Sequence, residues 1–177
     1  MRLSSLDILS MSHSYQLIWF RQDLRIHDHT ALWHATQAGQ CIALVILSPE
    51  QWQQHDDAPI KIEFYLRQLQ QLKQQLNTLN IPLIIQHIPL WKDVGNFFTE
   101  LLQRINIENV YANIELGVNE LKRDHDVQKV LNQQQKELIL FHARTLFHMR
   151  SIRNQSNLPY QDFAASHNPR SQRFHPR

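Results

Sequence analysis

The sequence predicts an α/β fold, a Rossmann-like five-stranded parallel sheet with helices on both faces. Short, nearly continuous apolar runs recur along the chain, as is typical of strands buried on both faces. Amphipathic segments with helical spacing alternate with these runs, and the connections between them are short. Such alternation gives parallel strands joined by right-handed crossovers. At 177 residues the chain can bury one core of ordinary size.

The two most apolar runs predict the centre of the sheet. Gln16 to Phe20 is short and aromatic, and Cys41 to Leu47 is almost continuously apolar. Between these runs, we expect Asp28 or Thr30 to cap a helix that Gly39 ends.

The remaining elements follow the same alternation. After an expected loop from Ser48 to Pro59, they are a helix from Pro59 to Leu79, a strand over 82–88, a helix over 94–105, a short strand over 109–112, a helix over 118–135 and a strand over 138–141.

The two ends lack this periodicity. Residues 1–13 look like a disordered extension before a second possible start at Met11, and they lack the features of a secretory signal. Apolar spacing stops after Phe141, so we expect a connecting segment over 143–163 and a disordered tail over 164–177. Residues 143–177 carry six arginines and one acid, which leaves the rest of the chain at about −3 and unsuited to binding DNA by itself.

Composition excludes several classes of protein. Three glycines leave no room for a dinucleotide-binding or P-loop glycine motif. No apolar run approaches the roughly 18 residues of a membrane span, so we expect a soluble protein without a membrane partner. A single cysteine rules out an internal disulfide framework and suits the reducing cytoplasm.

Ligand crevices in open parallel sheets lie at the carboxyl ends of the strands, where strand order reverses. Four charges of both signs, Arg21, Asp23, Arg25 and Asp28, follow the first strand. They suit either a functional site or a salt-bridged loop. We expect Asp23 to pair with an arginine of this loop or to accept from local backbone amides, and Asp23→Asn to lower stability.

Other chemistry-bearing residues favour structural interpretations. His27, His29 and His34 lack the partners of a metal site and are expected at the surface. Cys41 begins a buried strand and is expected to be a small core residue. The four tryptophans are expected to be core and rim aromatics: Trp19, Trp33, Trp52 and Trp91.

The segment from Leu17 to Asp28, Leu-Ile-Trp-Phe-Arg-Gln-Asp-Leu-Arg-Ile-His-Asp, closely resembles the opening of the DNA photolyase and cryptochrome family. The resemblance extends in order from residue 14 to 163, through 48–55, 81–83 and 118–124. It implies that residues 14–142 form the N-terminal antenna domain of a bacterial class I cyclobutane-pyrimidine-dimer photolyase. It also implies an interdomain linker from 143 and truncation before a helical domain, with a tail after 163 unlike the family.

The resemblance implies a chromophore site. His55, Asn119 and Glu120 match positions that contact the antenna 5,10-methenyltetrahydrofolate, while FAD, the catalytic residues and the binding of damaged DNA belong to the helical domain. Without the resemblance, Asn119 and Glu120 could simply open a helix and His55 could be a surface histidine. We therefore expect a monomer that is inactive in repair by itself, binds no FAD and binds folate weakly.

Two alternatives remain open. One is a nucleotide-binding module resembling universal-stress domains, although Gly117 alone supplies no phosphate loop. The other is a cryptochrome-like signalling or interaction protein, which would bind a partner through the exposed crevice.

Overall fold

The computed structural model describes residues 13–143. The chain divides into two units after Phe141, and the fold described below is that of the first. The expected extension, linker and tail lie almost wholly outside the described residues.

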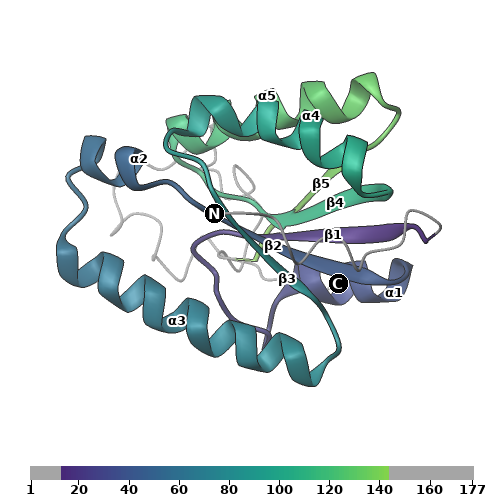
Figure 1. Ribbon diagram of the computed structural model, residues 1–177, viewed down its shortest axis with the longest axis horizontal. Coiled ribbons are helices and arrows are strands. Elements are labelled where there is room, and N and C mark those ends of the chain that lie inside the picture. Colours follow the sequence, from purple (N-terminus) through teal and green to yellow (C-terminus); the bar gives the residue numbers. More distant parts are fainter. Residues whose placement is uncertain (1–12, 144–177) are drawn as a thin grey trace, which may run out of the picture. The chain divides into compact units, whose positions relative to one another are not determined.

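The predicted five-stranded parallel sheet is confirmed (Figure 1). Its strand order is β3-β2-β1-β4-β5, so β1 lies at the centre and every pairing is parallel. The strands are β1 (Tyr15–Phe20), β2 (Cys41–Leu47), β3 (Leu83–His87), β4 (Ile107–Asn113) and β5 (Leu138–Phe141).

Helices cover both faces of the sheet. Figure 1 shows α4 and α5 on one face and α1 and α3 on the other. The helical segments are α1 (Thr30–Ala38), α2 (Pro49–Gln54), α3 (Pro59–Thr78), the 3-10 turn η1 (Trp91–Asp93), α4 (Val94–Arg104) and α5 (Val118–Gln133). None of the helices within residues 13–143 is long and apolar enough to cross a membrane.

Successive side chains of β1 point to opposite faces of the sheet and so belong to two separate hydrophobic cores. Leu17 and Trp19 pack among the side chains of α4 and α5, whereas Ile18 and Phe20 pack among those of α1 and α3. Every residue of β1 is buried, which explains why its sequence is apolar from Leu17 to Phe20 rather than alternating, and Gln16, its one polar residue, donates to Glu108.

The first crossover differs from the sequence prediction at two points. The expected loop from Ser48 to Pro59 contains α2, which begins with Pro49 in the first helical turn, a position that proline favours. The cap of α1 is His29 rather than Asp28 or Thr30, because Nδ1 of His29 accepts from the Leu32 amide at 3.0 Å. Asp28 instead adopts a left-handed backbone with φ of 49°, which aspartate tolerates.

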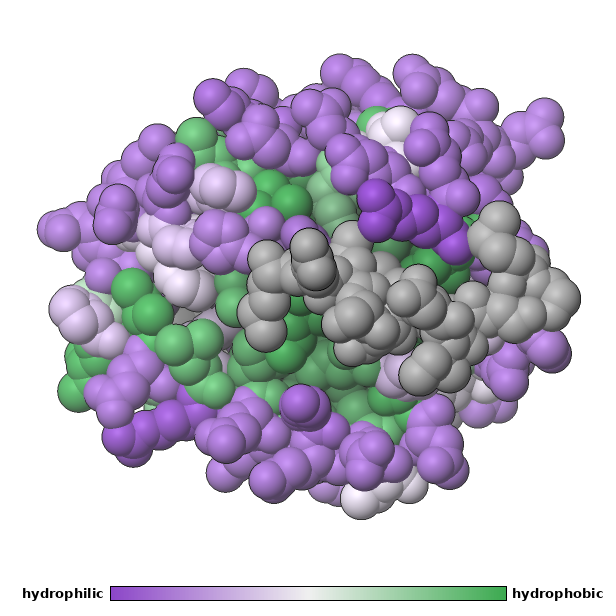
Figure 2. Space-filling view, in the orientation of Figure 1, coloured by the Kyte–Doolittle hydropathy of each residue, from purple (hydrophilic) through white to green (hydrophobic). Residues whose placement is uncertain are grey.

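Helix α3 is longer than the strands that it covers. Its 20 residues span about 30 Å, whereas the seven residues of β2 span roughly 23 Å. Leu69, Leu72 and Leu76 are buried against the sheet, but the overhanging first turns leave Ile60 and Phe64 exposed. Figure 2 shows hydrophobic side chains on the surface over these first turns. The overhang forms a wall beside the carboxyl ends of the strands.

We expect Leu72→Ala to lower the free energy of unfolding by about 3 kcal/mol, because Leu72 is completely buried between α3 and the sheet. Leu79→Ala is the matched control, since Leu79 is 47% exposed and should change stability by less than about 1 kcal/mol. Urea unfolding of both variants measures the difference, and equal losses would contradict this packing.

Candidate functional site

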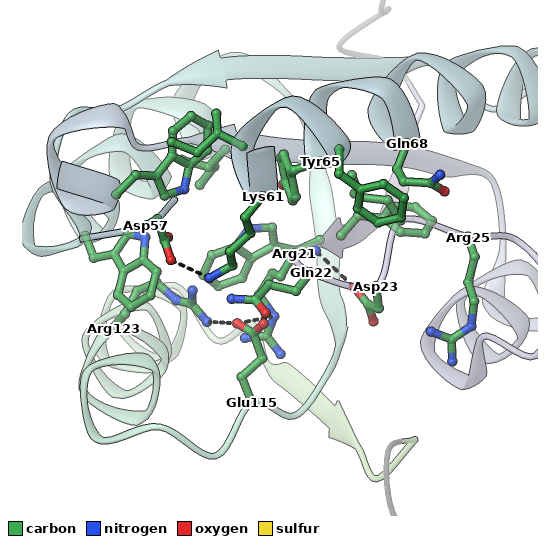
Figure 3. A pocket seen from close by; sticks show the side chains of 18 of the residues that line it. Arg21, Gln22, Asp23, Arg25, Asp57, Lys61, Tyr65, Gln68, Glu115 and Arg123 are labelled. Carbon is green, nitrogen blue, oxygen red and sulfur yellow. Dashed lines mark hydrogen bonds and ion pairs between the residues drawn. The ribbon is translucent and has the colours of Figure 1, made fainter. Parts of the chain in front are cut away.

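A pocket of about 390 Å³ opens at the carboxyl edge of the sheet (Figure 3). It lies between the loop after β1, the overhanging start of α3, η1 and the segment between β4 and α5. Its aromatic lining is Trp19, Phe20, Trp52, Phe64, Tyr65 and Trp91, and its charged lining is Arg21, Asp23, Arg25, Asp57, Lys61, Glu115 and Arg123.

An ion cluster closes the floor of this pocket. Arg21 donates from Nη1 to both carboxylate oxygens of Asp124, at 2.8 and 2.6 Å, and from Nη2 to the carbonyl of Asn113. Arg123 donates from Nη2 to Asp124 at 2.7 Å and to Glu115 at 2.9 Å. Two cations and two anions are thus buried together, with every side chain at most 6% exposed.

The two guanidinium groups also lie against tryptophan rings. The Cζ atoms of Arg21 and Arg123 are 5.1 and 4.8 Å from the centre of the Trp19 ring. Arg123 is also 4.9 Å from the centre of Trp91. These cation–π contacts fix Trp91 as a side wall of the pocket, supported from below by the ion cluster.

Asp23 does accept a local backbone amide, as predicted, but it does not pair with an arginine. Its Oδ1 accepts from the Arg21 amide at 3.1 Å, and its Oδ2 accepts from Asn113 Nδ2 at 2.8 Å and lies 3.1 Å from Nε2 of His29. The other alternative, a pair with an arginine of the loop, is not formed, because the Arg21 side chain extends to α5 and Arg25 donates to the carbonyls of its own loop.

His29 is buried, so the expectation of a surface histidine was wrong for this residue. Burial alone would raise the pKa of Asp23. The hydrogen bond and charge of His29, with the Arg21 amide and the Asn113 side chain, outweigh burial and hold the pKa of Asp23 well below its usual value. Asp23 is therefore a structural brace between the loop after β1, α1 and the end of β4.

The structure brings two of the three predicted site residues together. His55 follows the last turn of α2 and Asn119 lies in the first turn of α5, yet Asn119 Nδ2 is 3.2 Å from His55 Nε2. Glu120 follows Asn119 and is half-buried. The centre of the His55 ring lies 5.1 Å from that of Trp91 in an edge-to-face arrangement, so His55 contacts a residue that lines the pocket.

We call His55, Asn119 and Glu120 the rim, and Gly117 determines where the Glu120 side chain lies in it. A Cβ atom at position 117 would lie 2.6 Å from Cδ of Glu120, so the carboxylate occupies the space that a larger residue would fill. Glu120 is thus folded back over the start of α5, the position that a helix N-terminus favours for an acid.

Sequence reasoning missed Gln51, which is 9% exposed and holds the rim in place. Its Oε1 accepts from the Trp91 amide at 3.2 Å, and its Nε2 is 3.0 Å from His55 Nε2. The spacing of Gln51 and His55, four residues apart after Pro49, would have suggested a shared helix face if the segment had been recognised as a helix.

The structure gives no chemical role to Cys41 or to the tryptophans Trp19 and Trp33. Burial raises the pKa of the Cys41 thiol to about 11, and this half-buried thiol donates to the Gly39 carbonyl, which makes it a poor nucleophile. Trp33 is exposed and Trp19 is core, as the core-and-rim interpretation allows. Within residues 13–143, no group of three or more His, Cys, Asp or Glu side chains could hold a metal ion.

We expect Asp23→Asn to lower the free energy of unfolding by about 3 kcal/mol at neutral pH, since it leaves His29 buried without its carboxylate. The lowered pKa of Asp23 stabilises the native protein above the unfolded carboxyl pKa of about 3.9. That stabilisation is lost as pH falls through the native pKa of Asp23. In Asp23→Asn, the free energy of unfolding should therefore fall less on acidification than in the wild type.

Asp126→Asn is the control for this variant. Asp126 forms a partly exposed pair with Lys129 at 3.6 Å and should contribute less than about 1 kcal/mol. Thermal unfolding between acidic and neutral pH measures both variants. An unchanged melting temperature for Asp23→Asn would rule out the brace.

Comparison with known proteins identifies the family. The model of the DNA photolyase family matches residues 16–176. The deoxyribodipyrimidine photo-lyase of Vibrio cholerae is 38% identical over 120 residues, which cover 67% of this chain and 26% of that protein. The corresponding enzyme of Buchnera aphidicola from Acyrthosiphon pisum is 36% identical over 149 residues, which cover 83% of this chain and 31% of that protein.

The fold agrees with a solved structure of the same group. The cryptochrome of Synechocystis superposes with a TM-score of 0.69 at 24% identity, covering 79% of this chain and 29% of that one. The chain spans about a quarter to a third of these relatives. With the family model matching most of its length, the chain belongs to the DNA photolyase family and corresponds to its N-terminal α/β domain.

Proposed function

We propose that this chain is the light-harvesting domain of a deoxyribodipyrimidine photolyase and binds 5,10-methenyltetrahydrofolate at His55, Asn119 and Glu120. The contact between His55 and Asn119 carries the proposal, because it joins two polar residues 64 positions apart beside an aromatic wall. Members of the family bind FAD and an antenna chromophore and act on damaged DNA.

The rim offers the groups that a pterin ring needs. The Glu120 carboxylate and the Asn119 amide can accept from N–H groups on the ring edge, and His55 can add a further polar contact. When bound, the folate would supply absorption of near-ultraviolet or blue light. The residues of this chain bind and orient it, while Trp91 limits the approach of water from the pocket side.

Light-driven repair needs more than this domain. In the whole enzyme, the folate would supply absorbed light energy, and reduced FAD would supply the electron that splits the dimer and then returns to the flavin. Repair also requires the damaged bases to be extruded into a fitted pocket. We assign FAD and that pocket to the remaining length of the relatives, so the chain by itself should not repair DNA.

The enclosed pocket supports a second candidate site for the same function. Trp52 and Tyr65 are in edge-to-face contact at 5.9 Å, and Trp91 lines the same pocket. Such walls suit a planar heteroaromatic ring. Lys61 also lines the pocket, but its ammonium group already pairs with Asp57 (Figure 3). The rim is favoured for folate, since its hydrogen-bonding groups match a pterin edge.

Family membership separates the two alternative functions. Membership of the photolyase family replaces the universal-stress-like nucleotide-binding module. A cryptochrome-like role stays within the family, as the Synechocystis structure illustrates. The identity to photolyases over most of the chain favours the repair enzyme.

Titration of the full chain with methenyltetrahydrofolate, followed by folate absorbance and fluorescence, tests the proposal. We expect binding no tighter than high micromolar, because the rim groups are largely open to water. Glu120→Ala should weaken it roughly 3- to 10-fold, the equivalent of one hydrogen bond. Glu100→Ala removes an exposed acid from α4 and should leave binding unchanged.

Two outcomes would contradict this function. Stoichiometric FAD in the purified chain, or dimer splitting by the chain alone, would overturn the antenna assignment. Tight folate binding that survives Glu120→Ala but fails in Trp91→Ala would instead move the chromophore into the enclosed pocket.

Gly117→Ala tests whether the position of Glu120 matters rather than its charge alone. The new methyl group must displace the carboxylate, which is the flexible end of its side chain, so the melting temperature should change little. Folate affinity should fall about as far as in Glu120→Ala. Retained affinity in Gly117→Ala would show that Glu120 binds folate from another position, or not at all.

A further inference from the structure

We propose that Gln51 is a positioning residue that keeps the ring hydrogen of neutral His55 on Nδ1, and that this sets which chromophore edge the rim accepts. The proposal rests on the proposed function for the identity of the ligand. Its first part, the state of the ring, depends only on the contacts of Gln51, His55 and Asn119.

The orientation of the Gln51 amide follows from its backbone partner. The Trp91 amide N–H can only donate, so the Gln51 atom 3.2 Å from it must be the oxygen. The other end of the same amide is therefore the NH₂ group. Since Gln51 is buried and its own backbone amide donates to the Pro89 carbonyl at 3.1 Å, the side chain has little freedom to turn.

The state of His55 follows from the same logic. An NH₂ group can only donate, and Gln51 Nε2 lies 3.0 Å from His55 Nε2. Asn119 Nδ2 approaches the same ring nitrogen at 3.2 Å. Two donors facing one nitrogen require a lone pair there, so the hydrogen of the neutral ring is on Nδ1. Within the described residues, His55 Nδ1 has no hydrogen-bond partner, which leaves this N–H for a ligand.

The rim then has a defined hydrogen-bonding pattern. His55 supplies a donor, Asn119 directs one of its two N–H groups to His55 and keeps its oxygen as an acceptor, and Glu120 supplies an acceptor carboxylate. The complementary edge has one acceptor and two donors. A 2-amino-4-oxopyrimidine ring, as in a pterin, presents that pattern, whereas a 2,4-dioxopyrimidine ring presents an acceptor where the second donor is needed.

The ring state can be measured directly on the full chain. Long-range ¹H–¹⁵N correlation spectra of ¹⁵N-histidine-labelled protein, recorded above the usual histidine pKa of about 6.5, distinguish protonated from unprotonated ring nitrogens. His55→Gln assigns the His55 signals among the 11 histidines of the sequence. We expect the hydrogen on Nδ1 and an unprotonated Nε2.

Gln51→Glu replaces the donor that faces His55 Nε2 with an acceptor. It keeps the acceptor for Trp91 but places a carboxylate oxygen opposite His55 Nε2, so the hydrogen should move to Nε2. Asn119→Asp makes the same exchange from an exposed position and guards against a folding defect in the buried variant. Gln53→Glu, an exposed residue of the same helix, matches the added charge and should leave the ring unchanged.

Binding of two ring systems tests the consequence. Pterin and lumazine differ at position 2, where one has an amino group and the other an oxygen. Wild-type protein should bind pterin roughly 3- to 10-fold more tightly, the equivalent of one hydrogen bond. Gln51→Glu should weaken pterin binding by a similar factor, and Gln53→Glu should not.

The outcomes separate this inference from the proposed function. A hydrogen on Nε2 of wild-type His55, or a ring state that Gln51→Glu and Asn119→Asp both leave unchanged, would overturn the positioning role even if folate binds. A ring that responds as expected in a protein that binds no folate would support the positioning role and overturn the folate function. Equal binding of pterin and lumazine would overturn the proposed edge selectivity.

Discussion

The carboxyl edge of the sheet depends on the buried ion cluster of Arg21, Glu115, Arg123 and Asp124. Removing four charges from water is costly, and such a cluster persists only when cations and anions balance and their hydrogen bonds are made. Here one arginine comes from the end of β1, one acid from the segment after β4, and the other arginine and acid from α5. The cluster therefore ties together elements that are far apart in sequence, and it supports Trp91 through Arg123.

The cluster also determines which ligands this edge can take. Strand order reverses between β1 and β4, and in open α/β sheets ligands bind outside the strand ends at such a point. In this chain the two arginines at that point are already neutralised by Asp124 and Glu115. The few glycines also leave no glycine-rich loop to offer backbone amides to a phosphate, whereas aromatic side walls line the pocket. The geometry thus favours a flat ring over a nucleotide phosphate.

Periodicity predicted most of the fold, and the reason lies in the strands. β2 and β5 match their predicted bounds, because each is an uninterrupted apolar run. β2 is buried along most of its length, whereas β5, at the edge of the sheet, is mostly half-buried. Helix α2 was missed because its six residues are too few to show an apolar stripe. The exposure of Ile60 and Phe64 in the first turns of α3 was not predicted, because it follows from the helix being longer than the strand that it covers. The lengths of a helix and of the strand beneath it can be compared only once the fold shows which strand the helix covers.

The candidate site was predictable only in part, for a related reason. His55, Asn119 and Glu120 came from a family resemblance, and their separation in sequence gave no sign that His55 and Asn119 touch. Partners of buried charges were harder still to predict, since Asp23 has two arginines nearby in sequence, Arg21 and Arg25, but pairs with His29 at the start of α1. Hydrogen-bond partners depend on direction as well as distance, and direction is set by the completed fold.

The exposure of the rim limits how strongly the described residues can hold any chromophore. His55 and Asn119 are exposed, so each hydrogen bond to a ligand replaces one to water and adds little net free energy. Burial of the ring surface is the larger source of affinity, and on this side it comes mainly from Trp91. The rim therefore selects an edge pattern more effectively than it provides tight binding. For the chromophore proposed above, the polar groups of the rim would fix the orientation of the ring, whereas its affinity would depend on how much of the ring surface is covered.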